Sequence, residues 1–409
     1  MRLLWLTPEL PYWPGGSGGS TRQFHLIRRL RERGHEVTVV APVHPSQRDG
    51  PRALRATGAK LLAVERPAGR ASEVVHAVAR RPSLALEAIR RPLVAWQVEV
   101  FWTALRPLAQ RALAERPDVV LVEHDWAARW ADDLPAEVPR VLALENLSWG
   151  YYEARARAAS GGARALLSLE ARRFRRYDRA ALGAYDLLLA MSQTDRVSLA
   201  SVSDVRAEVI PNGVDTTALR PAPAPNAPAL LFTGTMSYPP NAEALIWLLR
   251  EIWPRVRDTV PDARLLVVGR DVPDEARRLA DPRVEIAGWV SDMAPWFARA
   301  SVVVVPILSG GGTRLKVLDG LASGRPVVST SMGAEGIAID DGTHAVIADS
   351  PDAFAQTAIR LLAEPEQAAR IGAAGRRLAE ERYDWRSIGD RLEALLAELA
   401  RGGSARARS

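Results

Sequence analysis

A glycine-rich segment from Leu308 to Gly320 holds the residues whose types and spacing best suit a chemical task. Its candidate ligand-binding residues are Gly310, Gly311, Gly312, Thr313, Arg314, Lys316 and Asp319. The glycines let the backbone approach a ligand closely, and a helix that starts here offers its first amides to an anion. Arg314 and Lys316 add fixed positive charge that suits a diphosphate, and Asp319 can accept hydrogen bonds from sugar hydroxyls. A loop with solvated charges is the alternative.

A second glycine-rich segment, from Gly15 to Thr21, precedes the first expected helix. Gly15 and Gly16 are its candidate ligand-binding residues, again because glycine permits close backbone approach. The segment does not fit the dinucleotide fingerprint, since Thr21 occupies the place of the third glycine. A plain flexible turn is therefore the alternative to a ligand loop.

His124 follows an apolar run and stands between Glu123 and Asp125. Two carboxylates and a histidine at consecutive positions are only a weak indication of a metal site, so a surface or acceptor-side role is the preferred interpretation. Because the chain contains no cysteine, thiolate metal sites, cysteine nucleophiles and disulfides are excluded.

The composition is that of an ordinary folded protein, with 409 residues of which 47% are hydrophobic and 25% charged. The formal net charge is +6, and Lys60 and Lys316 are the only lysines among 54 basic residues. We interpret this excess of arginine over lysine as a compositional bias. No basic-aromatic motif indicates a nucleic-acid partner. With no targeting segment and no membrane-spanning apolar stretch in the sequence, a cytoplasmic protein that contacts at most a membrane surface is expected.

Short apolar runs, nearly continuous in valine, leucine and alanine, alternate with helical stretches along the chain. Such runs are typical of parallel strands that are covered on both faces. In the first half the expected strands are Arg2–Thr7, Glu36–Ala41, Lys60–Glu65, Asp118–Glu123, Arg140–Glu145 and Asp186–Met191. The alternation predicts an α/β fold on an open parallel sheet, with ligands at the loops that follow the strands.

A proline-rich segment, residues 211–228, interrupts this alternation and is interpreted as a semi-rigid linker. Beyond it the expected strands are Ala229–Thr235, Ala263–Gly269, Val284–Val290, Ser301–Ile307 and Pro326–Ser331. The sequence thus predicts two α/β domains, residues 1–210 and 229–382, and a polar tail over 401–409 that is expected to be disordered.

The run from Ser309 to Thr330 resembles the donor-binding motif of GT-B glycosyltransferases of family 4. Members of that family typically show a glycine-rich loop, an acid on the following helix and then a small-Gly-basic-Pro-Val-Val sequence. Other segments resemble further landmarks of the family in order and spacing: Pro14–Gly19, Leu30–Val37, Ser192–Gln193, Val209–Asp215, Gly234–Met236, Val268–Gly269 and Gly288–Val290. The variants Tyr238–Asn241 and Trp253–Pro254 resemble the branch that builds cell-surface polysaccharides.

The resemblance implies a GT-B architecture, with two Rossmann-like parallel-sheet domains facing a central cleft and a C-terminal helix, residues 383–400, packing back on the first domain. It implies a retaining, metal-independent transfer of a sugar from a nucleotide-diphosphate donor, with no further cofactor, to a glycan or lipid-linked acceptor. The donor would lie on the second domain, close to Gly234 and Val290, and the acceptor mainly on the first. In keeping with this, the sequence contains no Asp-x-Asp motif for a divalent cation. Arg314 and Lys316 would stabilise the leaving diphosphate.

Three features depart from the family pattern. The first acid of the usual Glu-x7-Glu pair falls on Gly311 and the second on Asp319, so only Asp319 is expected to face the ribose. The histidine that commonly follows the strand Arg140–Leu144 is replaced by Glu145, which either places a charge near an oxocarbenium-like centre or caps a helix. The usual arginine and lysine are missing from Thr233–Asn241, which leaves the phosphate role to the cations of the glycine-rich segment.

Two stretches that contain or adjoin arginines are candidates for contact with a membrane. The aromatic stretch Leu93–Leu105, flanked by arginines, either docks on anionic lipid or packs its rings into the first domain. The arginine pairs at 172–173 and 175–176 either form a solvated helix face or are attracted to a membrane.

Two rival functions stay open on the sequence alone. One is a non-catalytic sugar-nucleotide-binding protein, which the altered glutamate pair would suit. The other is a nucleotide-sugar epimerase of the same fold.

Overall fold

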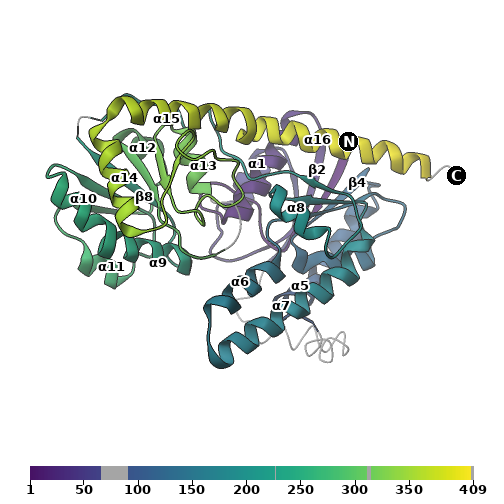
Figure 1. Ribbon diagram of the computed structural model, residues 1–409. Coiled ribbons are helices and arrows are strands. Elements are labelled where there is room, and N and C mark those ends of the chain that lie inside the picture. Colours follow the sequence, from purple (N-terminus) through teal and green to yellow (C-terminus); the bar gives the residue numbers. More distant parts are fainter. Residues whose placement is uncertain (66–90, 226, 311–314, 407–409) are drawn as a thin grey trace. The chain divides into compact units, whose positions relative to one another are not determined.

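The computed structural model describes residues 1–65, 91–225, 227–310 and 315–406 (Figure 1). The chain forms two compact units. Unit 1 comprises Met1–Pro211 and Ile388–Ser409, and unit 2 comprises Asn212–Ser387. Each unit is built on one parallel sheet, as the continuous apolar runs predict.

The sheet of unit 1 has the strand order β3-β2-β1-β4-β5-β6-β7, and all neighbouring strands are parallel. The strands are β1 (Arg2–Leu6), β2 (Glu36–Val43), β3 (Lys60–Glu65), β4 (Val119–Glu123), β5 (Arg140–Leu144), β6 (Leu187–Ala190) and β7 (Ala207–Val209). The six predicted strands are confirmed. The seventh, β7, was not predicted because it has only three residues at the edge of the sheet and none of them is fully buried.

The helices of unit 1 connect these strands. They are α1 (Gly18–Glu32), α2 (Gly50–Ala56), α5 (Leu93–Leu113), α6 (Ser148–Ala158), α7 (Gly161–Ala181) and α8 (Gln193–Leu199), with a 3-10 helix, η1, over Asp125–Asp133. Helix α1 begins at Gly18, inside the glycine-rich segment, since the Ser17 hydroxyl accepts a hydrogen bond from the backbone N–H of Ser20 at 3.0 Å. This is an ordinary N-cap that satisfies a free helix donor.

The aromatic stretch at the start of α5 packs into unit 1. Trp102 is buried and stacks on Trp130, with 4.5 Å between the ring centroids. Its indole Nε1 donates to Asp133 Oδ2 at 2.6 Å, which satisfies the buried N–H. Of the two interpretations of this stretch, packing into the domain is the one that the position of Trp102 supports.

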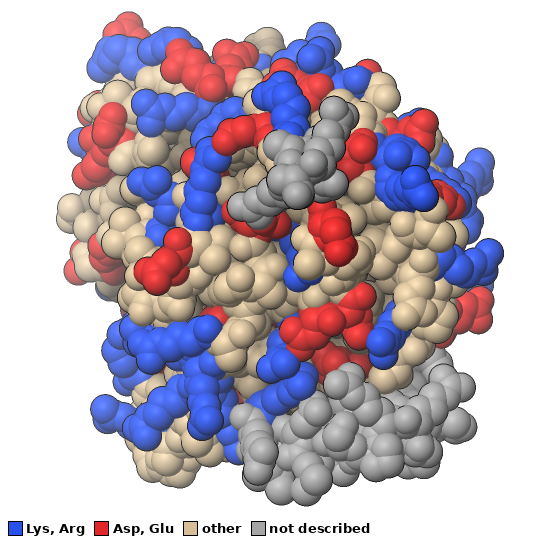
Figure 2. All heavy atoms as spheres, turned by 90° about the vertical axis from the view of Figure 1, so that its right-hand side faces the viewer, with Lys and Arg blue, Asp and Glu red and all other residues tan. Residues whose placement is uncertain are grey.

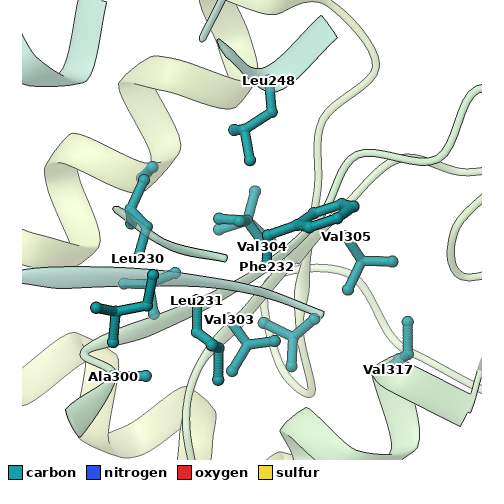
Figure 3. Close-up of a cluster of buried hydrophobic side chains, with 14 of the residues drawn as sticks. Leu230, Leu231, Phe232, Leu248, Ala300, Val303, Val304, Val305 and Val317 are labelled. Carbon is teal, nitrogen blue, oxygen red and sulfur yellow. The ribbon is translucent and has the colours of Figure 1, made fainter. Parts of the chain in front are cut away.

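The sheet of unit 2 has the order β10-β9-β8-β11-β12-β13, again with parallel neighbours. The strands are β8 (Ala229–Thr233), β9 (Arg264–Val268), β10 (Val284–Gly288), β11 (Val302–Val305), β12 (Val327–Ser329) and β13 (Val346–Ile347). Side chains of β8 and β11 form the centre of its core, as Figure 3 shows for Leu231, Phe232 and Val304. The two-residue strand β13 was too short to be predicted.

The helices of unit 2 are α9 (Pro239–Trp247), α10 (Trp253–Thr259), α11 (Asp274–Leu279), α12 (Ala294–Arg299), α13 (Leu315–Ala322), α14 (Pro351–Ala363) and α15 (Pro365–Leu378). Helices α9 and α10 are separated by a π-helical turn, Leu248–Ile252. The cause is Pro254, which has no N–H to continue the helical hydrogen-bond ladder. Among the described residues, no helix combines the length and apolar character of a membrane span.

Helix α16 (Trp385–Arg406) packs on unit 1 from Ile388 onward. Its residues Leu392 and Leu396 are buried, whereas Leu395 and Leu399 are half-buried. Arg29 pairs with Asp390 at 2.8 Å, and His35 with Glu393 at 2.8 Å. The helix continues to Arg406, into the segment 401–409 for which the sequence predicted disorder. Residues 407–409 lie outside the described residues.

We expect Leu392→Ala to lower the free energy of unfolding by about 2–5 kcal/mol, because it leaves a cavity under α16. The half-buried Leu395, changed to alanine, is the matched control and should cost about 1 kcal/mol or less. Chemical denaturation followed by circular dichroism measures both. Equal losses for the two variants would contradict the packing of α16 described here.

Candidate functional site

The strand order of unit 2 reverses beside β8, where β9 lies on one side and β11 on the other. The loops that follow β8 and β11 therefore run in opposite directions from the carboxyl edge of the sheet. Ligands of open α/β sheets bind at such a reversal. The loop after β8 begins with Gly234, and the loop after β11 leads to Gly310. Gly310 has a φ of +105°, which only glycine adopts readily.

Lys316, in the first turn of α13, extends to the loop after β8. Its Nζ donates to Oδ1 of Asn241 at 2.7 Å and lies 5.1 Å from the centre of the Phe232 ring. The other end of the amide is fixed as well, since Nδ2 of Asn241 donates to the backbone oxygen of Thr235 at 2.8 Å. A half-buried ammonium is thus held in one place by an amide and by a ring face.

Two glycines keep the backbone close to this ammonium. A Cβ at Gly234 would lie 3.1 Å from Nζ of Lys316 and 3.0 Å from Nδ2 of Asn241. A Cβ at Gly269, at the end of β9, would overlap the backbone oxygen of Gly234. Any side chain at these positions would therefore displace the loop after β8 or crowd the lysine.

Asp319 lies one turn after Lys316 on α13 and is half-buried. Burial raises the pKa of Asp319 to about 7, although the positive charge of Lys316 acts in the opposite direction. Near neutral pH the carboxyl group is therefore present in both protonation states, and it can either donate or accept a hydrogen bond.

Val290, the remaining predicted donor-side residue, follows β10, and its side chain packs against the hydrophobic core of unit 2. Gly311, Gly312, Thr313 and Arg314 lie outside the described residues. Of the described donor-side residues, the structure thus brings Gly234 and Lys316 together. Asn241, which completes their contacts, was not predicted as a site residue; its signal in the sequence is its place in the first turn of a helix directly after a strand end.

The glycine-rich loop of unit 1 is held by packing. Gly15 has a φ of +93°, and a Cβ at Gly16 would lie 2.5 Å from the backbone oxygen of Tyr12. A Cβ at Gly19, in the first turn of α1, would clash with the carboxylates of Glu9 and Glu145. Gly19 thus lets two carboxylates approach a helix N-terminus, where negative charge is stabilised.

A cluster of charged and polar side chains gathers at this helix N-terminus, which we call the Glu9–His124–Glu145 cluster. His124 Nε2 lies 3.3 Å from Glu9 Oε1 and 3.8 Å from Glu145 Oε1. Gln23 Nε2 donates to Glu145 Oε1 at 3.1 Å. The three charged residues follow β1, β4 and β5, which are adjacent strands, so the sheet places them at the same edge.

The protonation of the cluster follows from burial and mutual charge. Burial alone lowers the pKa of His124, but the carboxylates of Glu145 and Glu9 outweigh it and raise that pKa to about 10. The imidazole is therefore a cation at neutral pH. Burial raises the pKa of Glu145, and His124 partly offsets this effect. For the fully buried Glu123, burial and the nearby Glu145 raise the pKa well above its usual value.

Arg22 supplies a second buried positive charge beneath the cluster. Burial lowers the pKa of Arg22, while Glu123 and Glu145 raise it. Its guanidinium donates to the backbone oxygens of Pro211 at 2.6 Å and Ile210 at 2.8 Å, where the chain leaves unit 1. The same side chain thus neutralises the carboxylates and fixes the last residues of this unit.

For His124 and for Glu145, the structure excludes one of the two alternatives that the sequence left open. His124 is not a surface residue: it is buried, stacks on Trp126 at 4.2 Å between centroids and has a φ of +69°. Glu145 does not cap a helix, because α6 has Leu147 at its N-cap position, and Asp125 accepts the hydrogen bond from the Ser148 N–H at 2.8 Å. The physical reason is the same in both cases. His124 and Glu145 follow adjacent strands, so both side chains lie in the cluster at the carboxyl edge of the sheet.

The Glu9–His124–Glu145 cluster is also where a metal ion would find ligands. Its three ligand atoms lie within 4.8 Å of one another. A metal would, however, have to displace the proton that the two glutamates hold on His124, since only the neutral imidazole is a ligand. As described, the cluster instead offers a carboxylate and an imidazolium, which can accept a proton from a hydroxyl group and donate a hydrogen bond to an oxygen.

The raised pKa of Asp319 predicts how its removal changes stability with pH. The folded protein binds this proton more tightly than the unfolded chain, so ionisation of Asp319 costs stability as pH rises from about 4 to about 7. We expect Asp319→Asn to gain free energy of unfolding relative to the parent protein over this window, by at most about 1.4 kcal/mol per pH unit, and to show a constant difference above it.

Chemical denaturation at a series of pH values measures this difference. Asp352→Asn, which removes a carboxylate that is 73% exposed in the same unit, is the control. A pH-independent difference for Asp319→Asn would show that Asp319 is not held in a poorly solvated place.

Sequence profiles of two related families match the two units separately. The profile described as Glycosyltransferase Family 4 matches residues 16–218, and the one described as Glycosyl transferases group 1 matches residues 227–364. The first match contains the Glu9–His124–Glu145 cluster except for Glu9, and the second contains Lys316 and Asn241.

Curated relatives match parts of the chain. An uncharacterised 44.6 kDa protein in the cps region of Klebsiella pneumoniae is 29% identical over 31% of this chain and 35% of its own length. A phosphatidyl-myo-inositol mannosyltransferase of Mycobacterium leprae is 30% identical over 48% of this chain and 54% of its own. A GDP-mannose-dependent phosphatidylinositol monomannoside mannosyltransferase of Mycolicibacterium smegmatis is 28% identical over 52% and 62%. Each match thus spans less than two thirds of the relative.

Solved structures resemble the chain over nearly its whole length. A sucrose-phosphate synthase of Thermosynechococcus elongatus has a TM-score of 0.71 at 17% identity, covering 98% of this chain and 99% of its own. The Anabaena protein HepE, crystallised with UDP and glucose, has a TM-score of 0.66 at 15% identity, covering 97% and 100%. These structural similarities concern the fold, and the two sequence profiles indicate the family. The chain belongs to the group 1 and family 4 glycosyltransferases and has their GT-B fold, as its motifs predict.

Proposed function

We propose that this protein is a retaining, metal-independent glycosyltransferase that moves a sugar from a nucleotide-diphosphate donor to a glycan or lipid-linked acceptor. In this proposal unit 2 binds the donor and unit 1 binds the acceptor. The observation that carries it is the fixed position of the Lys316 ammonium at the strand reversal of unit 2, where Asn241 and two glycines hold the loop around it.

The proposed donor site stabilises the leaving group. When the bond between the anomeric carbon and the diphosphate oxygen breaks, negative charge grows on the diphosphate. A preorganised cation at that place lowers the barrier, because it needs no reorganisation during the reaction. Lys316 would supply this charge, backbone amides near Gly310 would add hydrogen bonds, and Asp319 would bind the ribose hydroxyls.

The proposed acceptor site is the Glu9–His124–Glu145 cluster. As the acceptor oxygen bonds to the anomeric carbon, its hydroxyl group becomes acidic and must pass its proton to a base, for which Glu145 is the candidate. Glu145 offers a carboxylate of raised pKa, and the imidazolium of His124 stabilises that carboxylate when it is ionised. Glu145 would also place negative charge near an oxocarbenium-like centre.

The names of the relatives indicate which substrates to test first. The Mycolicibacterium smegmatis relative is named as GDP-mannose-dependent and as acting on a phosphatidylinositol mannoside, and the Klebsiella pneumoniae relative is named for a cps region. We therefore propose a mannosyl donor and an acceptor of the lipid or surface-polysaccharide class. We further propose that the protein works in the cytoplasm, at the inner face of a membrane.

We expect Lys316→Ala to lower kcat/KM for donor turnover at least about 100-fold without unfolding the protein, since it removes the charge that stabilises the leaving diphosphate. The chain offers a matched control in Lys60, its other lysine, which is exposed and pairs with Glu115 on unit 1. Lys60→Ala should leave turnover unchanged. Release of nucleoside diphosphate from a panel of nucleotide sugars, with membrane extract as acceptor, measures both variants.

The same panel separates the rival functions. Binding of a nucleotide sugar without turnover would favour a non-catalytic binding protein, and an epimerised sugar would favour an epimerase. Unchanged turnover by Lys316→Ala would remove the proposed phosphate site. The assay is run with and without EDTA, and loss of activity with EDTA would contradict metal independence.

A second variant tests the acceptor site. We expect Glu145→Gln to lower kcat for transfer about 10- to 1,000-fold while the Kd for the donor stays the same, because it removes a carboxylate but keeps its shape. The control is Glu137→Gln, an exposed glutamate of unit 1. Calorimetric donor binding and the transfer assay give the two quantities. A weakened donor Kd with an unchanged kcat would assign Glu145 to the donor instead.

A further inference from the structure

Helices α6 and α7 form a hairpin in unit 1, joined by residues 159–160 (Figure 1). One side of the hairpin is anchored. Tyr152 of α6 stacks on Phe174 of α7, with 5.6 Å between the centroids, and the Tyr177 hydroxyl donates to the backbone oxygen of Trp126 at 3.0 Å. The hairpin is thus a firm part of unit 1 and has an inner face and an outer face.

The outer face of α7 begins with exposed leucines. Leu166 is 61% exposed and Leu169 is 43% exposed. They are three residues apart and therefore lie on the same side of the helix. A third leucine, Leu93, is 54% exposed, and its backbone N–H donates to Glu170 of α7 at 3.0 Å. Neighbouring exposed leucines are apolar surface that has no partner within the described part of the chain.

The same hairpin has a strong excess of positive over negative side chains. Residues 148–181 contain eight arginines and three acidic residues, against a net charge of +6 for the whole chain. The exposed arginines of the hairpin are Arg155, Arg157, Arg164, Arg172, Arg176 and Arg179. Figure 2 shows basic side chains gathered on the lower part of the molecule, at the height that the hairpin has in Figure 1.

Two of the three acidic residues of the hairpin, Glu170 and Asp178, are buried. Glu170 is buried and accepts a hydrogen bond from Arg173 at 2.7 Å. Asp178 is fully buried, and burial raises its pKa well above the usual value. Glu153 is half-buried, 3.6 Å from Arg175. Within the hairpin, all of whose residues the structure describes, Glu153 is therefore the acidic residue that water reaches most, and it lies beside an arginine.

The order of residues along the outer face of α7 matches the order of layers at a lipid surface. Leu166 and Leu169 lie nearest the tip of the hairpin, and Arg172, Arg176 and Arg179 follow at exposed positions with spacings of three and four residues. At 1.5 Å per residue the stripe is about 20 Å long. Leucines at one end suit the acyl boundary, and arginines suit phosphate headgroups.

We propose that this stripe, Leu166, Leu169, Arg172, Arg176 and Arg179, docks the protein on an anionic phospholipid bilayer. The charge is complementary to anionic headgroups, and the leucines lose their contact with water on the same surface. A nucleic acid would satisfy the arginines but leave the leucines exposed. The inference adds a partner to the proposed function, since a lipid-linked acceptor is found at such a surface, but the docking itself does not require turnover.

Flotation with phospholipid vesicles tests the proposal. The full-length protein should float with vesicles of phosphatidylcholine and phosphatidylglycerol and much less with phosphatidylcholine alone. Arg172→Gln/Arg176→Gln/Arg179→Gln should lower the partition coefficient at least tenfold. Leu166→Ser/Leu169→Ser should lower the partition coefficient as well. The binding that remains is electrostatic, so it should be lost at a lower salt concentration than the binding of the parent protein.

Matched variants elsewhere on unit 1 serve as controls. Arg52→Gln/Arg55→Gln/Arg111→Gln removes three exposed arginines from α2 and α5, and Val197→Ser removes a side chain that is 64% exposed. These should bind vesicles like the parent protein, and thermal unfolding confirms that every variant is folded.

Three outcomes would overturn the proposal: no binding to anionic vesicles, equal binding to neutral ones, or binding by the stripe variants that equals that of the controls. Binding to a DNA oligonucleotide that depends on the arginines but not on the leucines would assign the stripe to another polyanion. Release of nucleoside diphosphate is measured in parallel without vesicles. If that activity is absent while vesicle binding follows the expectation, the proposed function fails and the docking surface stands.

Discussion

In a parallel sheet the chain crosses back over one face of the sheet after every strand. Neighbouring loops leave the carboxyl edge in opposite directions only where the strand order reverses, and this opens a space for a ligand. In both units this reversal lies beside the first strand, β1 in one sheet and β8 in the other. The Glu9–His124–Glu145 cluster lies at the first reversal, and Gly234, Asn241 and Lys316 lie at the second. The strand order of each sheet thus sets where a ligand can bind, and the residues of the adjacent loops set the chemistry at that place.

The two places solve the problem of charge in opposite ways. In unit 1 several acidic side chains lie at one sheet edge, where His124 and Arg22 bring positive charge among them and burial raises the pKa of Glu123 and Glu145. In unit 2 a single ammonium is held beside a ring face and an amide, with Asp319 as the nearby acid. The proposed diphosphate would bring its negative charge to the loop that holds this ammonium.

Much of the fold could be predicted from the sequence, because buried parallel strands are continuous apolar runs. The two strands that were missed, β7 and β13, have three and two residues and carry too little pattern. The site was harder. Lys316 could be predicted because its loop is continuous in sequence. The contact of His124 with Glu9 joins residues 115 positions apart, so spacing cannot reveal it. Asn241 was likewise missed as a ligand-site residue, since only the fold brings it to Lys316 from 75 positions away.

The central claim is that the Lys316 ammonium holds a nucleoside diphosphate at the strand reversal of unit 2. A crystal structure of the protein with GDP or UDP tests it most directly. The account predicts a β-phosphate oxygen within about 3 Å of Lys316 Nζ, with the ribose hydroxyls beside Asp319. A diphosphate bound elsewhere on the chain, with Lys316 still hydrogen-bonded only within the protein, would contradict it.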